Sequence, residues 1–312
     1  MSSAPPPAGL ADVTATAGAP SADLLPPELL EELGGLEIVA RHVVRGFVSG
    51  MHRSPFLGAG EEFTRHRAYQ QGDEVRHIDW RLYGRTDRLY VKEFREDSNL
   101  QALILVDASA SMGYGQEPSK LRYATYLAGC LAHLMLRSGD AVGLAACTGG
   151  GTRFLLPARN RRGQLHEMLL ALEGLRAEGA VDLATALDEV GGALRRQGRV
   201  LVVSDFLDPD GRTDVLAAVG RLRARGDEVM GFRVATAQEL GRAPLPRARF
   251  FDPERPWEAV PADPASDPGF AARVDAWYDD LAAGFLAAGA EFEPLTTADP
   301  LGRALRAWVA RR

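Results

Sequence analysis

Three oxygen-bearing side chains stand at alternate positions just past an apolar run. Residues 103–106 read Leu-Ile-Leu-Val, which predicts a short strand buried on both faces, and Asp107, Ser109 and Ser111 follow it. In open α/β sheets, ligand sites lie beyond the carboxyl ends of the strands. One carboxylate and two hydroxyls suit a hard cation such as Mg²⁺. The alternative is that these side chains cap a helix and line a turn.

A second acid follows another short apolar run. Residues 199–203 are rich in β-branched side chains, and Ser204-Asp205 comes directly after them. If the fold is doubly wound, the two strands are parallel neighbours, and Asp205 lies near Asp107.

Strand and helix patterns alternate from residue 101 onward. This alternation predicts an α/β fold with a doubly wound, mostly parallel sheet and helices on both faces, preceded by a smaller N-terminal subdomain. An apolar stripe from Leu29 to Phe47, interrupted at Gly34-Gly35, predicts two short helices. We expect them to pack on the body of the protein, and the alternative is that they bind a partner. The predicted divisions are a disordered tail over 1–23, the N-terminal subdomain over 24–98 and the sheet domain over 99–312. The predicted helices cover 119–137, 159–175, 182–197, 213–225, 270–288 and 300–309, and the other predicted strands cover 141–147, 152–157, 227–234, 248–252 and 291–295.

Residues 58–85 alternate arginines with acids around two aromatic side chains. One interpretation is an Arg–carboxylate network that fixes this segment against its neighbours, since the planar guanidinium pairs well with carboxylates. The other is a recognition surface for a partner. The residues concerned are Glu62, Arg67, Tyr69, Asp73, Arg76, Asp79, Trp80 and Arg85.

Composition excludes several classes of function. The formal charge is −6 with no basic block, which argues against nucleic-acid binding. We expect no signal peptide and no membrane span, and Cys130 and Cys147 lie in apolar surroundings typical of reduced core thiols, which suits the cytoplasm. An aspartyl phosphatase would need a second acid where Ser109 stands, and no Gly-x-Ser-x-Gly surrounds the serines, so we expect no enzyme activity.

In this order and spacing, these motifs resemble a bacterial family known as domain of unknown function 58, over residues 36–312. The resemblance rests on the segment from Glu62 to Arg85, on Leu89-Tyr90-Val91-Lys92 and on the Asp-x-Ser-x-Ser motif at 107–111. Gly84 departs from the alanine typical of the family. The motif at 107–111 also resembles the metal-ion-dependent adhesion site of von Willebrand factor type A domains.

That second resemblance implies a metal site. Asp107, Ser109 and Ser111 would be direct ligands of Mg²⁺ or Mn²⁺, and Asp205 would reach the metal through water. The threonine that type A domains also supply falls at Val181, which offers no oxygen. Either Asp182 turns inward instead, or the metal binds weakly, or the site is empty.

The family resemblance implies a non-catalytic, magnesium-dependent protein-binding module. Such a module would act with a MoxR-type AAA+ ATPase, and with other type A domain proteins, in chaperone-like assembly or maturation of other proteins. Two alternatives stay open: a scaffold with a decayed metal site, and a metal-dependent hydrolase. The roles of residues 58–98 and 236–268 are not determined by the sequence.

Overall fold

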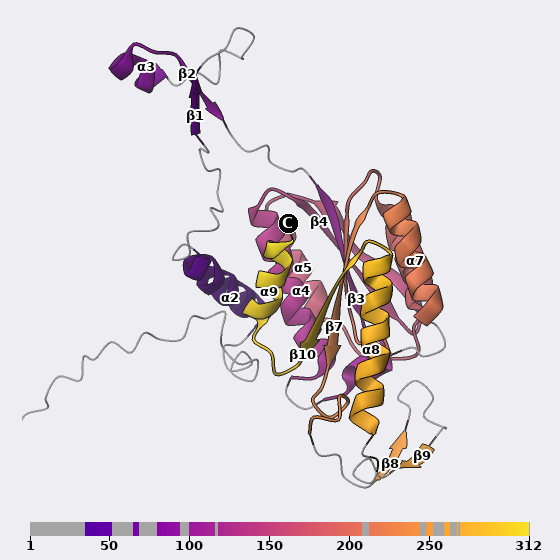
Figure 1. The fold of residues 1–312 in the computed structure, drawn as a ribbon. Helices are drawn as coiled ribbons and strands as arrows, with labels where there is room; N and C mark the ends of the chain where they lie inside the picture. Colours follow the sequence, from indigo (N-terminus) through magenta and orange to yellow (C-terminus); the bar gives the residue numbers. More distant parts are fainter. Residues whose placement is uncertain are drawn as a thin grey trace, which may run out of the picture.

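A six-stranded sheet forms the centre of the fold (Figure 1). The computed structural model describes residues 35–51, 65–68, 80–93, 100–115, 118–207, 212–243, 248–251, 259–262, 267 and 269–311. The sheet consists of β3 (Gln101–Asp107), β4 (Ala141–Thr148), β5 (Gly151–Arg159), β6 (Arg199–Ser204), β7 (Glu228–Ala235) and β10 (Glu291–Thr296).

The strand order confirms the predicted α/β fold. Across the sheet the order is β10-β7-β6-β3-β4-β5, and every neighbouring pair is parallel except the edge pair β4–β5, which forms an antiparallel hairpin. The first strand, β3, lies between β4 and β6, so the chain winds outward from it in both directions. Asp107 is therefore at the carboxyl end of a central strand.

Helices cover both faces of the sheet (Figure 1). Side chains of β3 alternate between two buried clusters, with Ile104 and Val106 in one and Leu103 and Leu105 in the other. On the first face lie α2 (Leu36–Met51), α4 (Lys120–Arg137), α5 (Gln164–Glu173) and α9 (Leu301–Ala310), and on the second lie α6 (Leu183–Ala193), α7 (Arg212–Ala224) and α8 (Phe270–Ala287).

The N-terminal helix α2 packs on the body, as its apolar stripe predicted. Leu36, Val39, Val43 and Phe47 are buried against a layer that includes α4, α5 and α9. These contacts place α2 with the helices of the sheet, although the sequence assigned it to the segment 24–98. The division of the chain at 98/99 stays a prediction.

Several boundaries differ from those predicted. The helix expected from residue 159 begins at Gln164, because β5 continues through Arg159 and Gly163 then turns the chain with a left-handed φ of 84°. The helix expected to reach residue 197 ends at Ala193, where Leu194 is already extended. The sequence also missed β9 (Ala259–Ala262), which pairs antiparallel with β8 (Ala248–Phe251).

Two short strands and a short helix are described in and just after the arginine-rich segment. Strand β1 (Arg65–Ala68) pairs antiparallel with β2 (Tyr90–Glu93), and α3 (Trp80–Thr86) lies between them in sequence. Trp80 is 58% exposed, and Arg85 is exposed as well. The predicted tail lies outside the described residues, and so does much of the predicted network. The network residues concerned are Glu62, Tyr69, Asp73, Arg76 and Asp79, and the side chain of Arg67.

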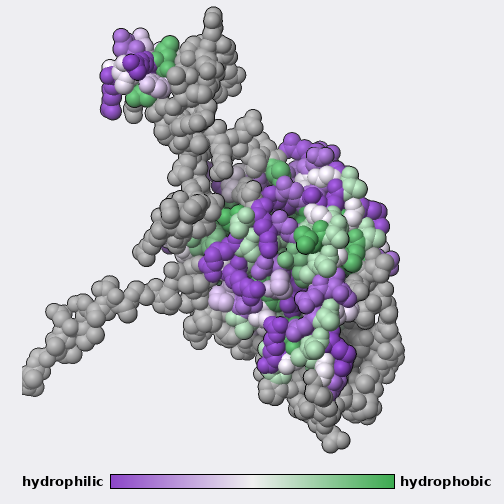
Figure 2. All heavy atoms as spheres, in the orientation of Figure 1, coloured by the Kyte–Doolittle hydropathy of each residue, from purple (hydrophilic) through white to green (hydrophobic). Residues whose placement is uncertain are grey.

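The outer surface is mixed in character. Figure 2 shows hydrophilic side chains over much of the visible face, with smaller groups of hydrophobic ones between them, as is usual for a globular domain. In the part of the chain that the structure describes, no helix combines the length and the apolar character needed to cross a bilayer.

Candidate functional site

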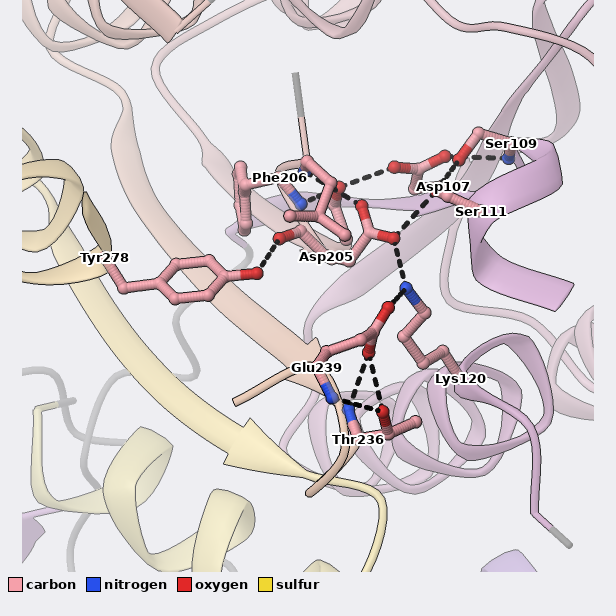
Figure 3. A network of polar contacts seen from close by, with 11 residues as sticks. Asp107, Ser109, Ser111, Lys120, Asp205, Phe206, Thr236, Glu239 and Tyr278 are labelled. Carbon is pink, nitrogen blue, oxygen red and sulfur yellow. Dashed lines mark hydrogen bonds and ion pairs between the residues drawn. The ribbon is translucent and has the colours of Figure 1, made fainter. Parts of the chain in front are cut away.

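Three loops at the carboxyl edge of the sheet meet around one group of polar side chains (Figure 3). Asp107 ends β3, Asp205 follows β6, and the turn from Thr236 to Glu239 follows β7. These strands are parallel neighbours, so their carboxyl ends lie side by side. The shared edge is what brings the two predicted acids together.

Asp107 is buried, and both of its carboxylate oxygens accept hydrogen bonds. Its Oδ1 accepts a hydrogen bond from the backbone N–H of Ser109 at 2.8 Å, and its Oδ2 accepts one from Ser204 Oγ at 2.5 Å. Burial, and next the nearby carboxylate of Asp205, raise the pKa of Asp107 to about 6. The hydrogen bonds from Ser204 and Ser109 oppose this rise, because they favour the charged form.

The two serines of the motif continue this network. Ser109 Oγ and Ser111 Oγ are hydrogen-bonded at 3.0 Å, and Ser111 Oγ donates to Asp205 Oδ2 at 2.7 Å. A short 3-10 helix, η3 (Ala110–Gly113), holds this spacing. The structure thus brings together Asp107, Ser109, Ser111 and Asp205, while their role as metal ligands stays a prediction.

A tight turn fixes Asp205. The N–H of Leu207 donates to Asp205 Oδ1 at 3.0 Å, and Tyr278 Oη donates to the Asp205 carbonyl at 3.2 Å. Between them Phe206 has a left-handed φ of 55°, a conformation that is rare for a large side chain and that concentrates at functional sites. The aromatic rings of Phe285 and Phe292 pack against Phe206 and hold it there.

A buried lysine, which the sequence analysis missed, lies at the centre of the site. Lys120 Nζ donates to Asp205 Oδ2 at 2.6 Å and to Glu239 Oε1, and its side chain is 0% exposed (Figure 3). Burial strongly opposes the charged form, but the two carboxylates outweigh it and leave the pKa of Lys120 above its usual value. The ammonium is therefore a fixed positive charge.

Glu239 is held in place for this contact. Its Oε2 accepts from the N–H of Thr236 at 2.8 Å and from Thr236 Oγ1 at 3.0 Å, which leaves Oε1 for Lys120. Glu239 lies 119 residues from Lys120 in sequence. Only the position of Glu239 shortly after a predicted strand could have pointed to it.

The loop before α6 reaches the site but brings no oxygen ligand to it from residue 181. Gly149 and Gly179 touch backbone to backbone, and the N–H of Ala110 donates to the Gly179 carbonyl at 2.8 Å. Val181 packs instead against the hydrophobic cluster of the second face. The suggestion that Asp182 turns inward is wrong: its carboxylate caps α6, accepting from the N–H and the hydroxyl of Thr185 at 2.9 and 2.6 Å.

As a whole, these residues fit a divalent metal poorly. Asp107, Ser109 and Ser111 supply the oxygens that Mg²⁺ prefers. However, the fourth predicted residue, Asp205, is paired with a buried ammonium, and the threonine position is an aliphatic Val181. Within the described ranges, no group of three or more His, Cys, Asp or Glu residues is arranged to hold a metal ion.

The same geometry does not indicate catalysis. Ser111 donates its proton to a carboxylate that is itself bound to Lys120, and both Asp107 oxygens accept hydrogen bonds. These groups hold one another in place. Cys130 and Cys147 are free and buried, as predicted, and burial raises the pKa of both thiols, which makes them poor nucleophiles.

A family profile matches most of the chain. The family described as "Protein of unknown function DUF58" matches residues 65–259, which include most of the arginine-rich segment and the site residues from Asp107 to Glu239.

Individual similar proteins were also found. An uncharacterized protein of Mycobacterium tuberculosis is 32% identical over 191 residues, and the match spans 60% of this chain and 60% of that protein's length. Among solved structures, the conserved hypothetical protein BatB from Bacteroides thetaiotaomicron has a TM-score of 0.49 at 15% identity, covering 68% of this chain and 98% of that one. The SpRpn10 VWA domain has a TM-score of 0.40 at 13% identity, covering 66% and 94%.

Proposed function

Since the chain belongs to the DUF58 family, we propose that it is a protein-interaction module that binds a partner protein through the carboxyl edge of its sheet. The observation that carries this proposal is the rim of the polar site. Tyr114 and Leu207 are 40% and 38% exposed, and each lies in a loop that is hydrogen-bonded to the site. Tyrosine is enriched in binding hot spots, and an exposed aliphatic side chain at the same site adds apolar contact area.

Hydrogen bonds to the polar site hold the backbone at Tyr114 and Leu207. Tyr114 follows η3 and donates its N–H to the Ser111 carbonyl at 3.0 Å, while Leu207 is bonded to Asp205. A preorganised rim loses little conformational entropy when a partner docks. The polar site thus contributes to binding by fixing two exposed anchors.

The partner we propose is a MoxR-type AAA+ ATPase, with chaperone-like assembly or maturation of other proteins as the shared task, in the cytoplasm. Family membership supports this proposal, together with a site that shows no arrangement for catalysis. Of the two binding hypotheses, the pairing of Lys120 with Asp205 favours a scaffold that needs no metal over a magnesium-dependent module. If Mg²⁺ or Mn²⁺ does bind, Asp107, Ser109 and Ser111 would hold it.

Interferometry with the immobilised ATPase of the source organism tests this function. We expect Tyr114→Ser and Leu207→Ser each to weaken binding by about tenfold or more, as loss of an anchor does. Leu286→Ser is the matched control, because Leu286 is 76% exposed near the end of α8, just before β10 begins at the opposite, amino edge of the sheet, and should change affinity by less than about twofold. Equal affinity of all four proteins would exclude this edge as the interface, and no binding by the wild type would exclude the ATPase.

A further inference from the structure

We propose that the Lys120 ammonium is the resident cation of this site and takes the place that a divalent metal would hold against Asp205. The buried carboxylate of Asp205 and the partly buried carboxylate of Glu239 converge on this one nitrogen (Figure 3). Charges withdrawn from water must be paired to be tolerated. Lys120 supplies that pairing from within the chain, so the site is complete without a bound ion.

The position of Lys120 on its helix supports this role. It is the first residue of α4, directly after the N-cap Ser119. The positive end of the helix dipole makes this a poor place for a cation, where an acidic residue is usually favoured. A fully buried lysine at such a position needs compensation from elsewhere, and the two carboxylates provide it.

The choice of lysine is itself informative. Lys92 and Lys120 are the only lysines in a sequence that otherwise uses arginine for its positive charges. An ammonium is a compact point charge with three donors, whereas guanidinium is a planar fork. Of the two side chains, only lysine resembles a small metal ion in size and in its ability to hold oxygens from several directions.

The ammonium also works against a metal beside it. A divalent ion bound by Asp107, Ser109 and Ser111 would share the Asp205 carboxylate with Lys120, because Ser111 and Lys120 donate to the same oxygen, Oδ2. Two positive charges that share one carboxylate in a buried site repel each other strongly. We therefore expect neither chelators nor millimolar Mg²⁺ to change the stability of the protein.

Thermal unfolding in EDTA and in about 10 mM Mg²⁺ tests the first consequence without any partner protein, so its outcome is separate from that of the binding experiment. We expect the two melting temperatures of the wild type to agree within about 1 °C. A metal with a dissociation constant near 0.1 mM would instead raise the midpoint by roughly 5–10 °C. A rise of that size, absent in Asp107→Ala, would overturn the proposal.

Replacing the lysine tests the second consequence. In EDTA, Lys120→Met should melt at least about 5 °C lower than the wild type, because it leaves the buried Asp205 and the partly buried Glu239 without a counter-charge. Arg137→Met is the control: it removes an exposed positive charge from the same helix and should shift melting by less than about 1 °C. Equal melting of Lys120→Met and wild type would contradict the proposal.

A measurement on the wild type keeps the proposal testable if Lys120→Met does not fold. Lysine labelled with ¹⁵N at Nζ gives signals from Lys92 and Lys120 alone. We expect the buried, hydrogen-bonded Lys120 ammonium to be protected from exchange and to keep its signal when Mn²⁺ is added. Selective broadening of that signal by equimolar Mn²⁺ would place the metal beside it and refute the inference.

Discussion

At the scale of single residues, Ser204 links the two strands that carry the site. It ends β6, donates to Asp107 Oδ2 at 2.5 Å, and accepts from the N–H of Phe206 at 2.8 Å. Its one hydroxyl thus stabilises a buried carboxylate and the turn that holds Asp205. In the sequence, Ser204 is marked only by its place before Asp205.

Removing this hydroxyl should destabilise the protein. We expect Ser204→Ala to lower the free energy of unfolding by about 1.5–3 kcal/mol, as for loss of a hydrogen bond to a buried charged group. Ser138→Ala is the control, because its hydroxyl donates to the Leu134 carbonyl near the helix end, and should cost less than about 1 kcal/mol. Urea unfolding measures both changes. Equal losses of unfolding free energy in the two variants would show that the hydrogen bond to Asp107 stabilises the protein no more than an ordinary one.

At the scale of elements, helix ends and helix contacts decide how the loops are held. Asp182 starts α6, and its two carboxylate oxygens both accept from Thr185. On the opposite face, His133 of α4 lies against α2, with Nδ1 3.4 Å from the Ala40 carbonyl. Each contact gives a prediction about its own helix.

For Asp182, capping and metal binding predict different results. We expect Asp182→Ala to destabilise the protein by about 1 kcal/mol, as for other N-cap replacements, and by the same amount in EDTA as in Mg²⁺. Asp182→Asn should retain most of the stability, since asparagine also caps helices well. A loss seen in Mg²⁺ alone would return Asp182 to the metal-ligand set.

For His133, the direction in which stability changes with pH follows from the pKa of its imidazole, which burial holds below the usual value. The folded protein therefore binds this proton less readily than the unfolded chain. The histidine's contribution to stability is present above about pH 6.5, the ordinary value, and is lost as pH falls through the lowered folded pKa. His133→Gln should reduce the loss of stability between about pH 7.5 and 5, measured by urea unfolding. His42→Gln, on the exposed side of α2, controls for removing an imidazole.

At the scale of the whole molecule, α2 tests where the domain begins. Phe47 is 2% exposed in a cluster that includes α4, α9 and the sheet. If α2 is part of the same cooperative unit, Phe47→Ala should destabilise the whole domain by about 3–5 kcal/mol in a single transition. Ile38→Ala, at a site 56% exposed on the same helix, should cost less than about 0.5 kcal/mol. A separate early transition would mean that α2 unfolds with another unit.

The sequence by itself determined the α/β fold and the common edge of Asp107 and Asp205. Short buried strands followed by acids produce this arrangement whenever the sheet is doubly wound, because parallel neighbours end at one edge. It also determined that Val181 offers no ligand. Exact helix ends were less predictable, since Gly163 and the extended Leu194 act through local backbone geometry that composition does not reveal.

Only the tertiary structure decided which cation Asp205 has. Lys120 comes from the start of α4, and Asp205 and Glu239 come from two loops. No periodicity in the sequence links a helix-initial lysine to acids 85 and 119 residues away. The sequence left Asp182 as a candidate ligand, and the structure assigned it to the cap of α6. The physical reason is the same in both cases: whether a buried charge is paired depends on distances across the fold, which only the folded chain sets.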